Sequence, residues 1–459
     1  MSYKLKFIVA ALAAGIAATA SANAPHHGKG PTVTLGGDLD TQFGYKSEKS
    51  PYNSVPAIIS DGDVIRPAEK FDRYGIVNDT RLYVRADGHA NCFKYGGLVV
   101  INADTSNSKF GYDPTDETPT GETLLGEPSV AYQTMMYVEN CMGRIEAGSY
   151  TGAYDALKTG GASLAHATGG IDGDWQYWVN TNVSKSFSPL LQAGKQIVNP
   201  NLLTAQDHSY VANASKITYY TPTWYGFKAG VTYIPDTQQH GTVTNLRPLL
   251  HKFSASTFRP NPNQITSGFT DVFQGGFGYH GKWDKVAFRF SALGEIGEAK
   301  KVNLAAGTIA DRKDLASWEL GASAHYMCFG LAGSYGDLGK SGQLKNITSG
   351  GVTKTVANSK SGKYWTLGAN YVHHHFGASF GYFNSRNGGF GVAPTFASPN
   401  YNTGKGKTTV YSFGIDYKLA PGFMPYAEYS NFSIKDGSIS GVGHKNSGGV
   451  FLAGSKLHF

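Results

Sequence analysis

The 459-residue sequence is poor in cysteine and has no long hydrophobic run beyond its first twenty residues. Only 3 residues are cysteine, which is too few for the disulfide framework of a small secreted scaffold. No later stretch approaches the roughly 20 consecutive apolar residues that a spanning helix needs. These shortages exclude a disulfide-stapled module and a bundle of membrane helices, so the exported chain is either soluble or a membrane β-barrel.

Charge is also sparse and nearly balanced. Charged residues make up 16% of the chain, and its formal net charge is +7. This is a small excess for a chain of this length, and the cations are not densely clustered. We therefore expect no nucleic-acid partner and only a weak preference for anionic solutes.

Aromatic residues and glycine are plentiful, with Gly 59, Tyr 28 and Phe 25, as in a β-rich chain with many turns. Side chains alternate along the C-terminal segment, where one parity holds Phe451, Ala453, Ser455, Leu457 and Phe459. A strand with one face in lipid and the other in a wet lumen has this pattern. The slightly negative mean hydropathy of the chain fits such strands, because only every second residue must be apolar.

The N-terminal segment reads as a secretory signal peptide over residues 1–22. Lys4 and Lys6 precede an apolar run, and Ala20-Ser21-Ala22 follows it as a small-residue cleavage site. The run is short and alanine-rich for an uncleaved membrane anchor. We expect the mature chain to cover residues 23–459, with a net charge of +5 once the two lysines are removed.

Sixteen segments share the strand pattern, and short turns alternate with long polar stretches between them. They cover residues 32–45, 79–88, 93–104, 131–139, 143–150, 214–221, 226–234, 270–280, 286–297, 316–326, 329–337, 364–372, 376–384, 409–419, 424–434 and 447–459. Short periplasmic turns and long extracellular loops are typical of outer-membrane barrels. The pattern predicts an all-β fold, a transmembrane antiparallel β-barrel of 16 strands that leaves an aqueous channel. A soluble β-sandwich has no need for this regular alternation of turn lengths.

Four pieces of the chain resemble Gram-negative general porins. They are the strand, turn and strand over 216–235, the segments 81–88 and 143–150, and the terminal Phe459. The resemblance implies an outer-membrane homotrimer of sixteen-stranded barrels, each with its third loop folded into the lumen. It also implies that Phe459 is read as an assembly signal.

The span 151–213 is where the sequence departs from that family. The expected Pro-Glu-Phe-Gly-Gly type of motif is missing, and glycine-rich sequence stands in its place. We predict that this span is the loop inserted into the lumen. A segment this long without structure is uncommon, so a second possibility is two further strands over 175–185 and 190–198. These strands would make an eighteen-stranded, substrate-specific channel.

The alternation along each strand shows which charged side chains face the predicted lumen. A lysine or arginine that faced lipid at the bilayer midplane would cost about 2 to 4 kcal/mol, so the inward orientation is favoured. The predicted pore-lining side chains on the strands are Arg81, Tyr83, Arg85, Lys94, Arg144, Glu146, Lys216 and Arg289. Opposite them the inserted loop offers Asp155, Asp172 and Asp174. Cations facing carboxylates would set up a transverse field that orients polar solutes and excludes apolar ones. The alternative is that these residues are simply solvated charges at loop bases and strand ends, without a role in the pore.

No motif for chemistry stands out. The sequence shows no nucleophile elbow, and the run 373–375 of histidines has no nearby carboxylate or cysteine that would support a metal site. Cys92, Cys141 and Cys328 all fall at predicted short turns, and whether the first two are bridged stays open. We therefore expect no enzyme, cofactor or metal, but a porin for passive diffusion of small hydrophilic solutes and ions. Its surroundings would be outer-membrane lipid and lipopolysaccharide. An adhesin or structural outer-membrane protein is the alternative.

Overall fold

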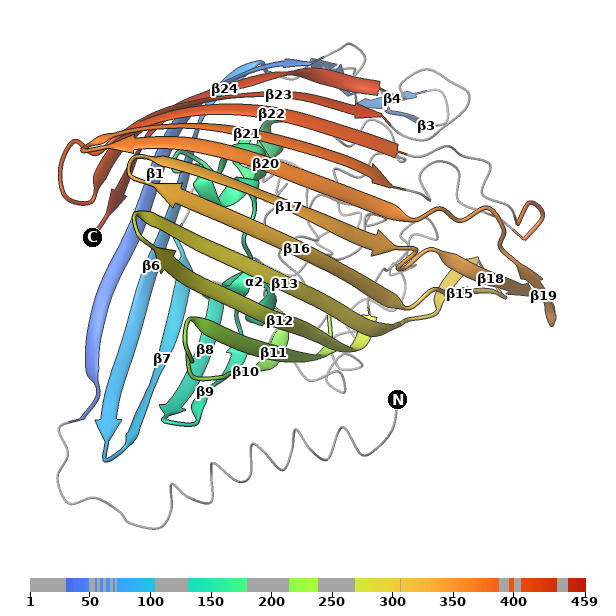
Figure 1. Cartoon of the computed structure of the whole chain (residues 1–459). Coiled ribbons are helices and arrows are strands. Elements are labelled where there is room, and N and C mark those ends of the chain that lie inside the picture. Colours follow the sequence, from blue (N-terminus) through green and yellow to red (C-terminus); the bar gives the residue numbers. More distant parts are fainter. Residues whose placement is uncertain are drawn as a thin grey trace.

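The computed structural model shows a closed antiparallel β-barrel (Figure 1). It describes residues 30–48, 54–55, 58–60, 63–66, 69–70, 72–103, 131–179, 214–237, 269–305, 307–387, 396–399, 406–435 and 445–459. Sixteen strands form the wall, and β1 pairs with both β24 and β6, so the sheet has no open edge. Closure gives every strand of the wall two neighbours, so that backbone amides can be satisfied within the sheet, as the interior of a bilayer requires.

The strands of the wall follow one another around the barrel in chain order. They are β1 (Thr32–Glu48), β6 (Tyr74–Ala90), β7 (Phe93–Asn102), β8 (Ala131–Asn140), β9 (Gly143–Ser149), β10 (Ser215–Tyr220), β11 (Phe227–Asp236), β12 (Phe269–Trp283), β13 (Val286–Ala299), β16 (Leu315–Tyr326), β17 (Phe329–Gly339), β20 (Gly362–His373), β21 (Phe376–Asn387), β22 (Gly406–Tyr417), β23 (Phe423–Lys435) and β24 (Lys445–His458). Each of the sixteen predicted strands corresponds to one of these. The sixteen-stranded prediction is therefore confirmed.

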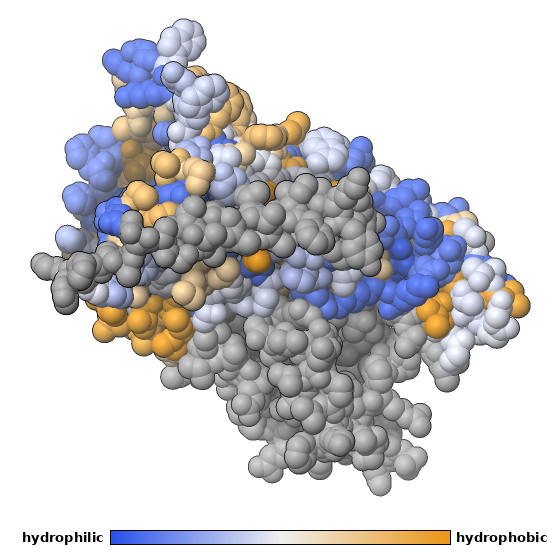
Figure 2. Space-filling view, turned by 90° about the horizontal axis from the view of Figure 1, so that it is seen from below, coloured by the Kyte–Doolittle hydropathy of each residue, from blue (hydrophilic) through white to orange (hydrophobic). Residues whose placement is uncertain are grey.

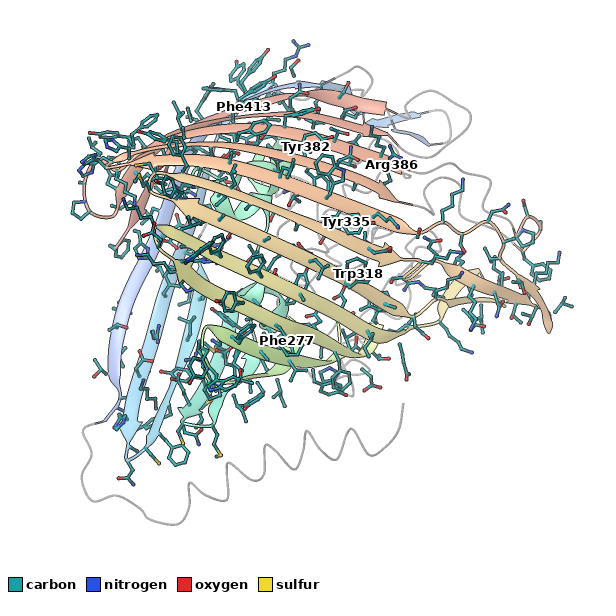
Figure 3. The ribbon with its side chains drawn as sticks, viewed as in Figure 1. Phe277, Trp318, Tyr335, Tyr382, Arg386 and Phe413 are labelled. Atoms are coloured by element: carbon teal, nitrogen blue, oxygen red, sulfur yellow. The ribbon has the colours of Figure 1, made fainter. Side chains whose placement is uncertain are left out.

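Alternation along each strand separates the two faces of the wall. On β22, Tyr411, Phe413 and Ile415 are exposed, whereas Ser412 and Asp416 are buried. The labelled aromatic side chains in Figure 3 stand along the outside of the wall in the same way. In the view of Figure 2, orange hydrophobic patches lie beside polar residues at the short-turn end, and a hydrophilic band (blue) crosses the molecule toward the long loops. The apolar outer face suits lipid, and the polar inner face suits water.

The two ends of the barrel differ in how the strands are joined. At one end the turns are short, and Asn91, Met327 and His374 adopt positive φ angles of 54°, 51° and 53°, as tight hairpin turns require. The C-terminus lies at this end (Figure 1). Cys92, Cys141 and Cys328 are all free, which settles the open question of a bridge.

Small sheets outside the wall lie toward the long loops. The largest has the order β14-β15-β18-β19, formed by Val302–Ala305, Thr308–Arg312, Leu344–Ser349 and Val352–Thr355. Two-stranded sheets pair β2 (Ser54–Val55) with β5 (Glu69–Lys70) and β3 (Ile58–Ser60) with β4 (Asp63–Arg66). None of these strands was expected from the sequence, because they pair in loop regions that carry no lipid-facing alternation.

The alternative of eighteen strands is wrong. β9 pairs directly with β10, from Ser149 opposite Ser215 to Arg144 opposite Tyr220, so the wall has no place for two more strands between them. Trp175–Trp178 forms the short helix α3 instead of a strand. The other proposed strand, 190–198, lies outside the described residues. In the described part of the chain, no helix has the length and apolar character needed to cross a membrane.

Candidate pore and constriction

The segment after β9 folds into the barrel as a chain of short helices. These are α2 (Ala153–Leu157), η2 (Gly161–Leu164), η3 (Gly170–Asp172) and α3 (Trp175–Trp178). α2 contacts β10 to β13, η2 contacts β17, β20 and β21, η3 contacts β21 to β23, and α3 contacts β24. In Figure 1, α2 lies behind β12 and β13, on the inner side of the wall. We call residues 151–179 the inserted segment; it covers the inner face from β10 round to β24.

Backbone amides of the inserted segment are held by hydroxyl groups of the wall. The donors Ala153, Thr159 and Gly161 reach the hydroxyl oxygens of Thr232, Ser291 and Thr366 at 2.8, 3.1 and 2.9 Å. Because these amides lie near the start of short helices or between them, they have few partners within the segment itself. Inward Ser and Thr residues of the wall supply the missing acceptors.

Glu428 on β23 holds the middle of the inserted segment. Its carboxylate accepts hydrogen bonds from Thr168 N at 3.1 Å, Thr168 Oγ1 at 2.6 Å and Gly170 N at 3.1 Å. The side chain is almost fully buried. A buried carboxylate with three donors is a well-satisfied anchor, because hydrogen bonds to a charged acceptor are stronger than neutral ones.

A buried ion pair holds the first turn of the inserted segment. Lys158 Nζ lies 3.2 Å from Glu319 Oε2, with side-chain exposures of 7% and 0%. The Tyr154 hydroxyl donates to the same carboxylate. Burial raises the pKa of Tyr154 well above its ordinary value of 10, with further contributions from Tyr364 and Glu319. The hydroxyl therefore keeps its proton and stays a donor at physiological pH.

Close packing presses the inserted segment onto the wall. A Cβ atom at Gly368 would lie 2.2 Å from the Gly161 carbonyl oxygen, so only glycine allows the two backbones to approach this closely. Farther on, the ring of Trp175 stacks on Phe432 with centroids 5.6 Å apart. The segment is thus fixed over its whole described length.

The inner face of β6 to β9 is not covered in this way, and we call it the open wall. Its inward cations keep much of their surface, with side-chain exposures of 33% for Arg81, 54% for Arg85, 65% for Lys94 and 24% for Arg144. The ladder places Arg81 opposite Asp38 of β1. Tyr83 on the same face donates its hydroxyl to Asp38.

Carboxylates accompany the cations of the open wall. Arg81 lies 3.4 Å from Asp79, and Arg85 lies 2.6 Å from Asp87. Arg144 reaches Glu146 at 2.6 Å and Glu139 at 3.3 Å, and Glu139 lies 3.9 Å from Lys94.

Tyr137 links these pairs across the strands. Its hydroxyl donates to Asp87 at 2.5 Å, and the Arg144 guanidinium lies 3.8 Å from its ring centroid. The open wall is therefore a connected surface of alternating charge.

The other predicted site residues lie elsewhere around the lumen. Lys216 is buried on β10, where its ammonium donates to the Tyr150 carbonyl oxygen at 2.5 Å and interacts electrostatically with Asp155. Arg289 is exposed on β13 near the short turns, opposite the buried Ser323. Lys216 is thus a support of the inserted segment, and Arg289 is remote from the open wall.

One aspartate of the inserted segment contacts the wall, and another makes a contact within the segment. Asp174 accepts a hydrogen bond from Gln42 on β1 at 2.7 Å, and Asp172 accepts one from Gln176 at 3.4 Å. Asp174 therefore joins the end of the segment to the strand beside the open wall.

The anchors of the inserted segment were not singled out from the sequence. Glu319 stands between the outward Trp318 and Leu320, and Glu428 between Ala427 and the outward Tyr429. Their parity marked both as inward, but it held no information on which residues would cover them.

The family comparison agrees with this architecture. The chain matches the Gram-negative porin family over residues 8–437. Two relatives are an uncharacterized protein of Rickettsia conorii, 25% identical over 395 residues that cover 78% of this chain and 82% of that protein, and one of Rickettsia typhi, 24% identical over 416 residues that cover 78% and 87%.

Solved porins are similar in structure at low sequence identity. An anion-selective porin from Comamonas acidovorans is 15% identical, with a TM-score of 0.48 and coverage of 94% of this chain and 100% of that one. The outer membrane protein OmpT of Vibrio cholerae is 12% identical, with a TM-score of 0.48 and the same coverage. From the family match and the barrel, the chain belongs to the Gram-negative porin family and forms a diffusion channel in the outer membrane.

Proposed function

We propose that solutes pass between the inserted segment and the open wall, and that this passage has weak ion selectivity. One observation carries the proposal: cations on β6 to β9 stay solvent-accessible, whereas inward charges such as Glu319 and Glu428 are buried under the segment. Water and solutes reach only the accessible charges. The pore-lining residues are then Arg81, Tyr83, Arg85, Lys94 and Arg144, with Glu146 largely buried beside Arg144.

The selectivity follows from how these charges are arranged. Each arginine of the open wall has a carboxylate within 3.4 Å, so the wall is close to neutral. Such a surface orients dipolar solutes without excluding either sign of ion. The small positive charge of the whole chain adds a weak preference for anions.

Conductance measurements test this passage. Purified protein in a planar bilayer should give stepwise conductance, and a salt gradient should give a small reversal potential with the sign of anion preference. A silent bilayer with intact barrels would contradict the channel path. A reversal potential near the limit for one ion would contradict the near-neutral wall.

We also propose that the protein is a homotrimer set in lipid and lipopolysaccharide, exported with residues 1–22 as a leader. The family supports the trimer, and the charged and apolar pattern of the N-terminal residues supports the leader. Native mass spectrometry of the membrane-extracted protein tests both. It should report three copies, each beginning near Asn23; a monomer, or a chain that keeps its leader, would count against the respective proposal.

Phe459 is proposed as an assembly signal. Its backbone exchanges hydrogen bonds with Gly37 at 3.0 and 3.1 Å at the seam between β24 and β1, and its side chain is 60% exposed. An exposed ring can be recognised before the seam closes. Deleting Phe459 should lower the amount of protein in the outer membrane while export continues, whereas replacing it with Tyr should have little effect.

A further inference from the structure

Cations of neighbouring strands stand directly opposite one another at the long-loop end of the barrel. Lys363 on β20 pairs in register with Arg386 on β21, and Arg386 pairs with Lys407 on β22. The register continues from Lys407 to Lys435 on β23 and from Lys435 to Lys445 on β24. We call Lys363, Arg386 and Lys407 the cation row.

The cation row lies on the outer face of the barrel. Its three residues are exposed, whereas the next residues along the strands, Tyr364, Ser385 and Thr408, are buried. Figure 3 shows Arg386 toward the long-loop end of the wall, beyond Tyr382 and Phe413. The row therefore faces the surroundings of the barrel and not its lumen.

The arrangement is unfavourable for the protein alone. Like charges directly opposite each other on a sheet destabilise it, because their Cβ atoms are only about 4.5–5.5 Å apart. Asp337 on β17 compensates Lys363 at 3.4 Å. Within the described residues, no ion pair is formed by Arg386 or Lys407. The row therefore keeps a net positive charge that an external anion would stabilise.

From the cation row toward the short turns, the outer face changes in the same order as the parts of a lipid molecule. The rings of Trp365, Tyr382 and Tyr411 form a continuous line, with centroids 4.6 and 4.8 Å apart. Such a girdle marks the membrane interface. Beyond it toward the short turns lie apolar residues such as Phe413 and Ile415, both about half exposed. Along the barrel axis, the cations thus lie at the depth of a lipid headgroup and the aromatic rings at the membrane interface. The apolar side chains lie at the depth of the acyl chains.

We infer that the cation row binds a glycolipid of the outer leaflet through a headgroup carrying more than one phosphate. Arginine and lysine side chains bind phosphate through charge-assisted hydrogen bonds. Adjacent strands are about 4.8 Å apart, so the row spans about 10 Å and can contact separate phosphates of one headgroup. The inference rests on the outer-membrane location of the barrel and names one site for the lipid proposed above.

Binding of bis-phosphorylated lipid A to the folded protein in neutral detergent tests this site. The double variant Arg386→Gln/Lys407→Gln should bind at least about tenfold more weakly than the wild type, because it loses two charged donors to phosphate. Higher salt should weaken wild-type binding and have less effect on the variant. A matched control, Lys285→Gln/Lys418→Gln, removes the same charge from the short-turn end and should stay within about twofold, since screened charges at the far rim do not reach the row.

Three comparisons can overturn the inference. Equal binding by the double variant and the wild type, or an equal loss in the control, would reject the cation row as the site. Equal binding of dephosphorylated lipid A would reject phosphate recognition. If phosphatidylglycerol or inorganic phosphate bound as tightly as lipid A, the assignment to a multiply phosphorylated glycolipid would fail. Unchanged single-channel conductance of the double variant separates any of these results from loss of the channel.

Discussion

The covered part of the inner wall and the open wall carry similar side chains but use them differently. Under the inserted segment, Glu319 and Glu428 are 0% and 1% exposed and hold its helices. On the open wall, Arg85 and Lys94 keep 54% and 65% of their side-chain surface. Both sets are inward charges on strands of one barrel, Glu319 and Glu428 on β16 and β23, and Arg85 and Lys94 on β6 and β7. What covers a charge therefore decides whether it serves as a structural anchor or can contact a solute.

Removing most of the inserted segment is the strongest test of this comparison. Replacing Gly160–Trp175 by a short glycine-serine linker should expose the covered wall and raise single-channel conductance about twofold, because conductance follows the open cross-section. Folded barrels, judged by heat-modifiable migration in gels, are the control. Unchanged conductance in intact barrels would show that the inserted segment does not limit the passage.

Breaking the buried ion pair between Lys158 and Glu319 should partly detach the inserted segment from the wall. Glu319→Ala removes the carboxylate that pairs with the buried Lys158, and breaking a buried ion pair in this way costs about 3–5 kcal/mol. We expect noisier and larger conductance steps, together with cleavage of the segment by added protease. Glu319→Gln keeps an acceptor for Tyr154 and should have a smaller effect. A quiet channel of wild-type size in Glu319→Ala would mean that the other anchors suffice.

Neutralising the arginines of the open wall should change ion selectivity without displacing the inserted segment. Arg81→Gln, Arg85→Gln and Arg144→Gln together remove the arginine partners of Asp79, Asp87, Glu139 and Glu146. The open wall then carries a net negative charge, so the reversal potential should move toward cations. The shift should be larger at low salt, because fields are screened over about 10 Å at 0.1 M. Arg289→Gln, far from the open wall, is the matched control and should shift it little. Equal shifts in both would place the selective region elsewhere.

A smaller effect is expected at alkaline pH. The pKa of Tyr154 is raised in the attached segment by burial, so attachment favours the protonated hydroxyl. As the pH rises above 10, the ordinary pKa of tyrosine, a detached Tyr154 ionises and attachment is progressively weakened. Conductance noise should therefore grow above pH 10 in the wild type. Tyr154→Phe, which has no proton to lose, should not show this rise.

Much of the barrel could be read from residue alternation. A lipid-facing strand must place apolar residues at every second position, as Tyr411, Phe413 and Ile415 do on β22, and this constraint is local. The same parity assigned Arg81 and Arg144 to the lumen. It could not reveal the four-stranded sheet of β14, β15, β18 and β19, since strands outside the membrane need no such alternation.

Local sequence patterns could not predict the path of the inserted segment through the barrel. Its anchors join residues far apart in the chain, such as Thr168 with Glu428 and Tyr154 with Glu319. Nothing near Glu428 in the sequence indicates that a loop some 260 residues earlier will cover it. The cation row has the same character, because Lys363, Arg386 and Lys407 become neighbours only through strand register.

The sequence alone determined the class of fold and the face on which strand charges such as Arg81 and Arg144 lie, and it favoured sixteen strands, because the bilayer imposes a two-residue period on every spanning strand. Only the tertiary structure decided which inward charges stay open to solutes, since that depends on where the inserted segment packs. It also decided which outward cations stand side by side. Both outcomes depend on contacts between distant residues, which no local period encodes.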